Sequence, residues 1–499
     1  MRPVHPRLFL AWGALFVPCA LGLMLLKGST LDEPHLWDAL GCYVGQARFI
    51  AQHGLDLSRY SELGFVRPPL FTGTLAAVMH WISASRQAMH LTTLLFCAAI
   101  LPSLYLLTRT LSGSRAAALL AVVLCVATPS FFAQSGLVHS DLPATAFTTL
   151  AWLLLLRGQQ RGFAVAATLG VLTKESAYFV CVPAALWLLW QQGQSLRTIL
   201  RRGPLAGRWL HHALLLWPVI VPIAVLAAWQ LGQRFLVGAV LPSIYSGYVG
   251  PGNLPASLLH NVVTGGRLFL VLAALPVLWA AWHGRDSEDP RRDPRRITAL
   301  AFVLLPFLFP TPLPRYQLPS LPLLCALAAL GLFQLSRLWR VPAMAAVLAL
   351  LVLGLNGLWF RRDNAHKEVS MAYREQLRLY KQATAWLAAA SPRGVIAGFP
   401  MTSMLTAPPE DGFLDRRVPI VAATADPATL CRADFLVEAQ DDTVGPVLQK
   451  LGRCGALQLA VQLGPTTPVF VPGTWALLDP ERDAAIRIYR VSCPESCRL

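Results

Sequence analysis

The stretch that decides the fold is Leu8–Leu26, which reads LFLAWGALFVPCALGLMLL. It carries no charged side chain and is long enough to cross a bilayer as an α-helix. Lys27 ends this stretch, and the acidic pair Asp32-Glu33 follows closely. A carboxylate that enters the hydrocarbon costs about 3 kcal/mol, so acids at such a membrane edge are either solvated or functional.

Composition places the whole chain among the multi-pass membrane proteins. Of its 499 residues, 55% are hydrophobic and only 14% are charged, whereas about a quarter of a soluble globular chain is charged. The formal charge of +16 does not indicate a nucleic-acid partner, because the arginines lie between apolar runs and form no basic stripe interleaved with aromatic residues. Leu8–Leu26 is too long for a signal peptide and lacks a cleavage site before Asp32, so we expect it to be retained.

Further apolar runs follow up to residue 360 and predict about eleven transmembrane helices in all. These runs are 88–108, 115–133, 142–157, 162–173, 175–192, 211–231, 263–282, 297–310, 316–335 and 341–360. Loops on the side of the N-terminus are rich in arginine, and the alternate loops are poor in it. Because cytoplasmic loops carry the basic excess, the N-terminus is predicted to be cytoplasmic, in the inner (cytoplasmic) membrane. Asp32-Glu33 and everything after Phe360 then lie outside the cytoplasm.

Two predicted external loops, about 27–87 and 232–262, are longer than simple connectors. In the first loop, Leu36–Ile50 has apolar residues at helical spacing and is expected to lie along the membrane surface. Residues 68–84 form a second apolar stretch, re-entrant or interfacial, because a full crossing would reverse the later topology against the arginines.

The tail, residues 363–499, is predicted to be a soluble extracytoplasmic domain. A helical section at Lys367–Ala390 precedes several short strand-like runs, which indicates an α/β or α+β fold. Four cysteines in the tail favour disulfides in an oxidising compartment, although the sequence does not reveal their connectivity. The alternative is a zinc site, but no paired CxxC is present. The four are Cys431, Cys454, Cys493 and Cys497.

Side chains suited to chemistry gather on the predicted external face. They are Asp32, Glu33, His35, Arg67, His139, Asp141, Lys174, Glu175 and Arg315, with Tyr245 and Tyr248 in the second long loop. A carboxylate can deprotonate an acceptor, and cations can neutralise the charge that develops on a phosphate leaving group. This mixture suits transfer from a membrane-embedded phosphate.

Several of these residues belong to motifs that follow one another along the chain. The motifs are Asp32-Glu33, Arg67-Pro68-Pro69-Leu70, Asp141 at the start of a span, Gly170–Lys174 and Pro314–Pro319. Their order resembles the GT-C superfamily of membrane glycosyltransferases, in the branch of protein O-mannosyltransferases and lipid A aminoarabinose transferases. The resemblance covers about residues 8–335. It implies a polytopic α-helical membrane fold, a polyprenyl-phosphate-linked sugar as donor, and an envelope glycan, lipid or protein as acceptor.

The resemblance also implies roles for the acidic residues. Asp32 becomes the general base, and the alternative is a solvated loop acid. Glu33 becomes a supporting carboxylate, since neighbouring residues in regular structure point in different directions. Asp141 positions the acceptor or holds a metal, and the alternative is a helix N-cap, a position that Asp favours.

The cations Arg67, Lys174 and Arg315 become ligands of the donor phosphate, and the alternative is simple snorkelling at the membrane surface. Arg67 stands where relatives commonly carry lysine, and Glu175 stands where they often carry glycine. His35, His139, Tyr245 and Tyr248 are assigned to acceptor recognition or gating. No residue set has the spacing of metal ligands, but relatives differ in their use of a divalent metal, so no cofactor is assigned with certainty and a divalent metal stays open.

Two other functions compete with glycosyl transfer. A transporter or flippase of a lipid-linked glycan intermediate would place ionisable groups in broken helices near the middle of the membrane. Here such groups cluster at one face. A sensor or assembly scaffold that binds a partner through the exported tail would leave the motifs at the membrane face without a role.

Overall fold

The computed structural model describes most of the chain. The described residues are 6–54, 56, 59, 62, 67–191, 206–237, 250–263, 267–283, 293–311, 313–338, 348, 373–398, 400–415, 417–439, 444–464, 469–471, 476–478 and 486–494. Tyr245, Tyr248 and all but one residue of the predicted span 341–360 lie outside them.

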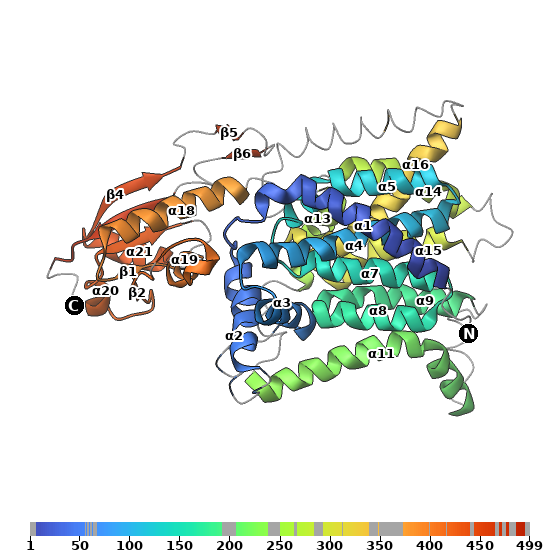
Figure 1. The fold of residues 1–499 in the computed structure, drawn as a ribbon, viewed down its shortest axis with the longest axis horizontal. Helices are drawn as coiled ribbons and strands as arrows, with labels where there is room; N and C mark the ends of the chain where they lie inside the picture. Colours follow the sequence, from blue (N-terminus) through green and yellow to red (C-terminus); the bar gives the residue numbers. More distant parts are fainter. Residues whose placement is uncertain are drawn as a thin grey trace.

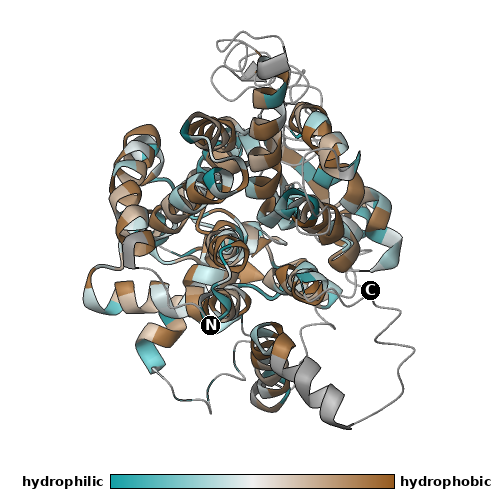
Figure 2. Ribbon diagram, turned by 90° about the vertical axis from the view of Figure 1, so that its right-hand side faces the viewer, coloured by the Kyte–Doolittle hydropathy of each residue, from teal (hydrophilic) through white to brown (hydrophobic). Residues whose placement is uncertain are grey.

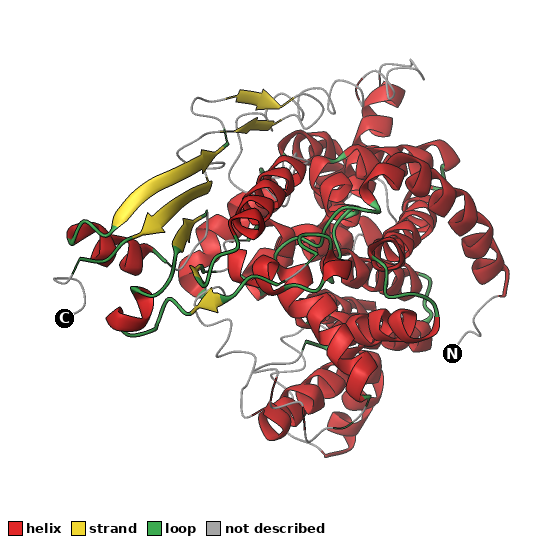
Figure 3. Ribbon diagram, turned by 60° about the vertical axis from the view of Figure 1, so that its left-hand side comes forward, coloured by secondary structure: helices red, strands yellow, loops and turns green. Residues whose placement is uncertain are grey.

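A bundle of helices accounts for the described part of residues 6–338 (Figures 1 and 3). The predicted apolar runs up to residue 335 all appear as helices. These are α1 (Pro6–Lys27), α4 (Arg86–Ser112), α5 (Arg115–Ala127), α6 (Pro129–Gln134), α7 (Asp141–Leu156), α8 (Gln160–Thr173), η4 (Glu175–Val180), α9 (Cys181–Gln191), α11 (Ala206–Val237), α14 (Leu268–His283), α15 (Pro294–Leu308), η7 (Pro314–Ser320) and α16 (Leu321–Leu338). Two further short elements, η5 (Pro251–Asn253) and α13 (Leu254–Val262), precede α14.

Local sequence sets the ends of the helices. The Ser85 side chain caps α4 by accepting a hydrogen bond from the backbone N of Ala88, and Ser114 caps α5 in the same way. Gly113 ends α4 with a φ of 70°, a left-handed conformation that glycine adopts without strain. The chain therefore reverses within two residues, and α4 packs against α5.

The helices are those of a membrane protein. Four described segments are long and apolar enough to cross a bilayer: Leu8–Thr30, Arg86–Ser112, Leu215–Phe235 and Pro314–Ser336. The first and third bury only 17% of their apolar window inside the protein, so most of that surface is available to lipid. Figure 2 shows hydrophobic residues over helices all around the bundle. The total of about eleven spans stays a prediction.

The first external loop forms short helices, as its apolar spacing predicted. After η1 (Gly28–Thr30), the π-helix η2 (Ala39–Val44) runs directly into α2 (Gly45–His53), and α3 (Pro69–Trp81) follows. Pro69 occupies the first turn of α3, where its missing N–H costs nothing. Both α2 and α3 lie toward the end of the bundle that carries the C-terminal region (Figure 1).

The C-terminal region, residues 373–494, combines helices with a mixed sheet. It opens with α18 (Tyr373–Ala390), and the larger of its two described sheets has five strands in the order β2-β1-β3-β7-β4. β1 is parallel to β2 and β3, whereas β7 is antiparallel to β3 and β4. The strands are β1 (Val395–Ile396), β2 (Ile420–Val421), β3 (Phe435–Glu438), β4 (Leu457–Leu463) and β7 (Ile486–Val491). The remaining helices are α19 (Met401–Thr406), η9 (Pro409–Asp411), α20 (Pro427–Leu430) and α21 (Gly445–Arg453).

This region agrees with the predicted α/β or α+β fold. The antiparallel pair of β5 (Val469–Val471) and β6 (Ala476–Leu478) is an addition that the strand pattern did not predict. The division into domains 1–362 and 363–499 stays a prediction, because its boundary falls outside the described residues.

Cysteines of the C-terminal region form disulfides rather than a zinc site. Cys431 after α20 is bonded to Cys493 after β7. Cys454 is also disulfide-bonded, and Cys497 lies outside the described residues. The bond between Cys431 and Cys493 ties the end of the last strand to the body of the region.

The hydrophobic core of the C-terminal region includes residues from two loops of the bundle. Leu36 and Leu40 of the first loop and Leu137 of the segment before α7 are buried in it. They pack in one cluster with α18 and α19, which contribute residues such as Tyr373 and Met404. Bundle and C-terminal region are therefore joined by a shared core as well as by the chain.

Candidate active site

Asp38 lies where the backbone turns sharply into η2. The preceding residue, Trp37, has a φ of 43°, a conformation that bulky residues seldom adopt. A π-helix is rare and often marks a functional site. Asp38 Oδ2 accepts a hydrogen bond from Arg315 Nη2 at 2.5 Å, and the two side chains are 20% and 8% exposed. The pair is thus largely buried but can still be reached from outside.

A second ion pair, Lys174 with Asp141, is more deeply buried. Lys174 Nζ donates to Asp141 Oδ1 at 2.5 Å. The ammonium also lies 3.6 Å from the ring centre of Tyr316, a cation–π contact. Tyr316 follows Arg315 in η7, so this one short helix contacts both ion pairs.

Arg67 lies beside η2 and α2 and acts electrostatically on Asp38. Its backbone N donates to Gln46 Oε1 at 3.0 Å, and its guanidinium lies 5.6 Å from the ring centre of Tyr43. The Tyr43 hydroxyl accepts from Ser140 Oγ at 2.9 Å, which links η2 to the start of α7. Glu175 is among the groups that act electrostatically on Arg67.

The charges of this cluster determine its protonation. Burial raises the pKa of Asp38, but Arg315 and then Arg67 oppose it, and the resulting pKa lies well below its usual range. Asp38 is therefore ionised at neutral pH. Burial, and next the charge of Arg315, lowers the pKa of His139 to about 3, so its ring is neutral.

On the acids and the histidine of the cluster, three buried polar atoms have no hydrogen-bond partner among the described residues. They are Asp141 Oδ2, His139 Nε2 and Glu175 Oε1. Buried polar atoms are nearly always paired, so unpaired ones mark a place for water or a ligand. A ligand with several hydroxyl groups would satisfy them.

Known proteins resemble this chain in sequence over part of its length and in fold over nearly all of it. Residues 66–225 match the family model described as dolichyl-phosphate-mannose-protein mannosyltransferase. ArnT from Cupriavidus metallidurans bound to undecaprenyl phosphate superposes with a TM-score of 0.56 at 14% identity, over 97% of this chain and 99% of that chain. Its apo state gives 0.55 at 16% identity over the same shares. No curated protein matches the chain in sequence.

This chain has the GT-C fold. The match extends over the bundle and the C-terminal region together, since it covers nearly the whole of both chains. The resemblance inferred from the ordered motifs is therefore confirmed, together with the polytopic helical fold class.

Within this GT-C fold, six of the candidates from the sequence lie together. They come from four separate segments, which the bundle brings to one end. These residues are Arg67, His139, Asp141, Lys174, Glu175 and Arg315. Their roles as donor or acceptor ligands stay predictions.

Asp32, Glu33 and His35 make their contacts elsewhere. Asp32 is 64% exposed and pairs with Arg86 at 2.8 Å. Glu33 forms an ion pair with Arg374 of α18. His35 is buried beside Asp411 of the C-terminal region, with 3.8 Å between His35 Nε2 and Asp411 Oδ1. All three thus contact the N-terminal end of α4 or the C-terminal region.

Sequence reasoning missed Asp38, Tyr43 and Gln46 as site residues. A signal for Asp38 was present in the sequence, because Leu36–Ile50 has the apolar spacing of an amphipathic helix. Asp38 is the only acid in that stretch and lies between the apolar positions Leu36 and Leu40. An acid set among residues that must be buried is a candidate for function.

Arg267 is a further buried cation that the sequence analysis did not select. It precedes α14 and is 1% exposed. Its Nη1 donates to Asn261 Oδ1 and to Ser320 Oγ, both at 3.2 Å. Ser320 ends η7, so the same short helix that carries Arg315 also contacts Arg267. Among the described residues, no group of three or more His, Cys, Asp or Glu side chains is arranged to hold a metal ion.

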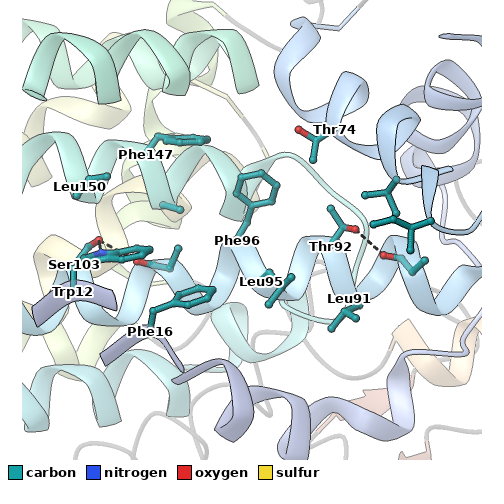
Figure 4. A pocket seen from close by; sticks show the side chains of 15 residues that line it. Trp12, Phe16, Thr74, Leu91, Thr92, Leu95, Phe96, Ser103, Phe147 and Leu150 are labelled. Atoms are coloured by element: carbon teal, nitrogen blue, oxygen red, sulfur yellow. Dashed lines mark hydrogen bonds between the residues drawn. The ribbon is translucent and has the colours of Figure 1, made fainter. Parts of the chain in front are cut away.

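An apolar cavity of about 530 Å³ lies in the bundle between α1, α3, α4 and α7. Figure 4 shows the rings of Trp12, Phe16, Phe96 and Phe147 around it. A row of ring contacts leads from it to the polar cluster. The steps are Phe147 to Phe96 at 5.9 Å, Phe96 to Phe71 at 6.1 Å, and Phe71 to Tyr43 at 5.7 Å.

Proposed function

We propose that this protein is an integral-membrane glycosyltransferase that moves a sugar from a polyprenyl-phosphate donor to an acceptor outside the cytoplasm. The carrying observation is the ionised Asp38, which pairs with Arg315 and feels the charge of Arg67, in a cluster with three unpaired buried polar atoms. ArnT, which shares the fold, has been crystallised with undecaprenyl phosphate, and this supports a lipid phosphate as the sugar carrier. The acceptor is an envelope glycan, lipid or protein.

In the proposed reaction, an acceptor hydroxyl or amine attacks the anomeric carbon of the donor sugar. The bond from that carbon to the phosphate oxygen breaks, and its electron pair leaves with the polyprenyl phosphate. Arg67 and Arg315 neutralise the charge on the departing phosphate. The acceptor proton passes to the Asp38 carboxylate. Asp141 and His139 bind sugar or acceptor hydroxyls through their unpaired atoms.

The contact between Asp38 and Arg315 couples donor binding to base strength. In the free protein Arg315 donates to Asp38, which makes the carboxylate a weak base. A donor phosphate competes for the same guanidinium. Once Arg315 turns to the phosphate, burial dominates and the pKa of Asp38 rises, so the base becomes stronger only when donor is bound.

The apolar cavity lined by Phe96 and Phe147 is the proposed place for part of the donor's polyprenyl chain. Its lining is almost wholly apolar, and it lies beside α3, whose first turn follows Arg67 directly. A lipid with its phosphate at Arg67 would extend along α3 toward this cavity.

Asp38, rather than Asp32, is proposed as the general base, because Asp32 is largely exposed and lies outside the cluster. Asp38→Asn should lower transfer at least about 100-fold, since it removes the base but keeps the side-chain shape. Asp32→Asn is the matched control and should retain activity within a few-fold. Envelope mass spectrometry of a deletion strain complemented with each variant measures this.

Two results would contradict these proposals. If the deletion strain lost no sugar from its envelope lipids, glycans or proteins, the transferase function would be rejected. If Asp32→Asn failed to restore the missing sugar while Asp38→Asn restored it, the base would be Asp32, as the sequence motif alone suggested.

A further inference from the structure

The residues before and after Asp38 are buried against the C-terminal region. Leu36 and Leu40 are 1% and 6% exposed and belong to the core formed by α18 and α19. Trp37 packs against the same core. Asp38 therefore lies between residues that are held from outside the bundle, and it cannot shift without withdrawing them.

A partly buried ion pair holds the next part of this segment. Asp411 at the end of η9 accepts from Arg48 Nη2 at 2.8 Å, and its side chain is only 3% exposed. Arg48 lies in α2, two residues after Gln46. Because Gln46 accepts from the backbone of Arg67, the ion pair supports Arg67 as well as the helix that follows Asp38.

The loop before α7, which carries His139, is also held by the C-terminal region. Leu137 lies in the shared core, two residues before His139. A Cβ atom at Gly136 would lie 2.6 Å from the Tyr373 hydroxyl, so α18 packs closely against this loop. Figure 1 shows α18 and α19 at the end of the bundle, where the loops are.

The backbone at Trp37 indicates that this support is needed. A positive φ at a bulky residue persists only where the surroundings determine it. Within the bundle, Asp38 has its ion pair with Arg315, whereas Trp37 packs against the shared core, most of whose residues come from the C-terminal region.

We infer that the C-terminal region positions the candidate active site, with Leu36, Leu40 and the Arg48–Asp411 pair holding Asp38 and Arg67 in place. Asp411 and Arg48 are then positioning residues, which act through Asp38 and Arg67 without touching substrate. This inference rests on the proposed transferase function for its effect on activity, but its structural part can be tested separately.

The test compares four variants of the full chain in nanodiscs with the wild type: Asp411→Asn, Arg48→Gln, the charge swap Arg48→Asp with Asp411→Arg, and the control Asp434→Asn. Asp434 pairs with Arg393 inside the C-terminal region, away from the loops. Hydrogen exchange of residues 35–48 should become about tenfold faster in the first two, because the ion pair that ties α2 to the C-terminal region is lost. The swap should restore slow exchange, and the control should match the wild type.

Transfer provides the second measurement, by complementation of the deletion strain. Asp411→Asn should lower transfer and the swap should recover it, at thermal midpoints equal to that of Asp434→Asn. Unchanged exchange in Asp411→Asn, or recovery of folding without recovery of transfer in the swap, would overturn the inference. If the wild type transfers no sugar, the proposed function fails, and the exchange rates still decide whether the C-terminal region holds the loops.

Discussion

At the scale of single residues, the contact between Asp38 and Arg315 sets the chemistry. Burial alone would raise the pKa of a carboxylate, and here the neighbouring guanidinium groups reverse that effect. Asp32, a few residues earlier, has the same carboxylate but lies in solvent beside Arg86. The difference between a loop acid and a candidate base is therefore one of surroundings.

Removal of Arg315 should move the acid limb of the pH–rate profile. Asp38 acts in its ionised form, so the rate falls as pH drops through its pKa. In the free protein, Arg315→Gln removes a cause that lowers this pKa and leaves burial, which raises it. The acid limb of the kcat/KM profile, which reports the free enzyme, should therefore move to higher pH. Arg315→Lys keeps a cation and should stay closer to the wild type. Transfer by membrane vesicles across a pH series measures the limb, and an unmoved limb in Arg315→Gln would exclude Asp38 as the titrating group.

At the scale of elements, short irregular helices organise the site. η4 lies between α8 and α9, η7 precedes α16, and η2 runs into the short helix α2. All three bend the chain at the end of the bundle. η7 alone presents Arg315 to Asp38, Tyr316 to Lys174 and Ser320 to Arg267. Long helices provide the frame, and these short elements direct side chains into it.

The cavity beside α3 should determine donor affinity. Ala99→Trp fills it with an indole and should raise the KM for a polyprenyl-linked donor about tenfold, equal to about 1.4 kcal/mol, while kcat changes little. Leu119→Trp on the exposed side of α5 is the control for a bulky residue in the bundle, since Leu119 is 60% exposed. Rates measured against donor concentration separate the two parameters. An unchanged KM in Ala99→Trp would remove the lipid chain from this cavity.

At the scale of the whole molecule, His35 lies in the seam between bundle and C-terminal region. It is 1% exposed, stacks on His90 at 5.2 Å and lies beside Asp411. Burial, and next the charge of His90, holds the pKa of His35 well below its usual value. The folded state thus requires a neutral ring at this seam.

Stability should therefore depend on pH through His35. In the unfolded chain the pKa of the ring is about 6.5, and in the folded protein it is lower. The stabilisation is therefore complete at pH values above the unfolded pKa. It is lost as pH falls toward the folded pKa, because the unfolded state then binds the proton more tightly. The thermal midpoint should fall between pH 7 and pH 5.5, and His35→Gln should make this fall smaller. Part of the fall should stay, because burial lowers the pKa of His139 as well. His80→Gln, at an exposed position, should keep it, and equal slopes in all three proteins would contradict the role of His35.

The sequence by itself determined the membrane class, the positions of the helices up to residue 335, the mixed C-terminal fold and most of the ionisable cluster. These features depend on local composition, because a helix in lipid must be apolar along its own length. The positions of Arg67, Asp141, Lys174 and Arg315 at helix ends were readable for the same reason.

Only the tertiary structure decided which acid enters the cluster and what holds it there. Asp32 and Asp38 are both acids of the first external loop, and no local property separates them. The separation comes from the turn at Trp37, which is held by the core of a region more than 330 residues later in the chain. Contacts between such distant segments leave no periodic pattern in either one, so packing alone brings Asp38 to Arg315 and directs Asp32 to solvent.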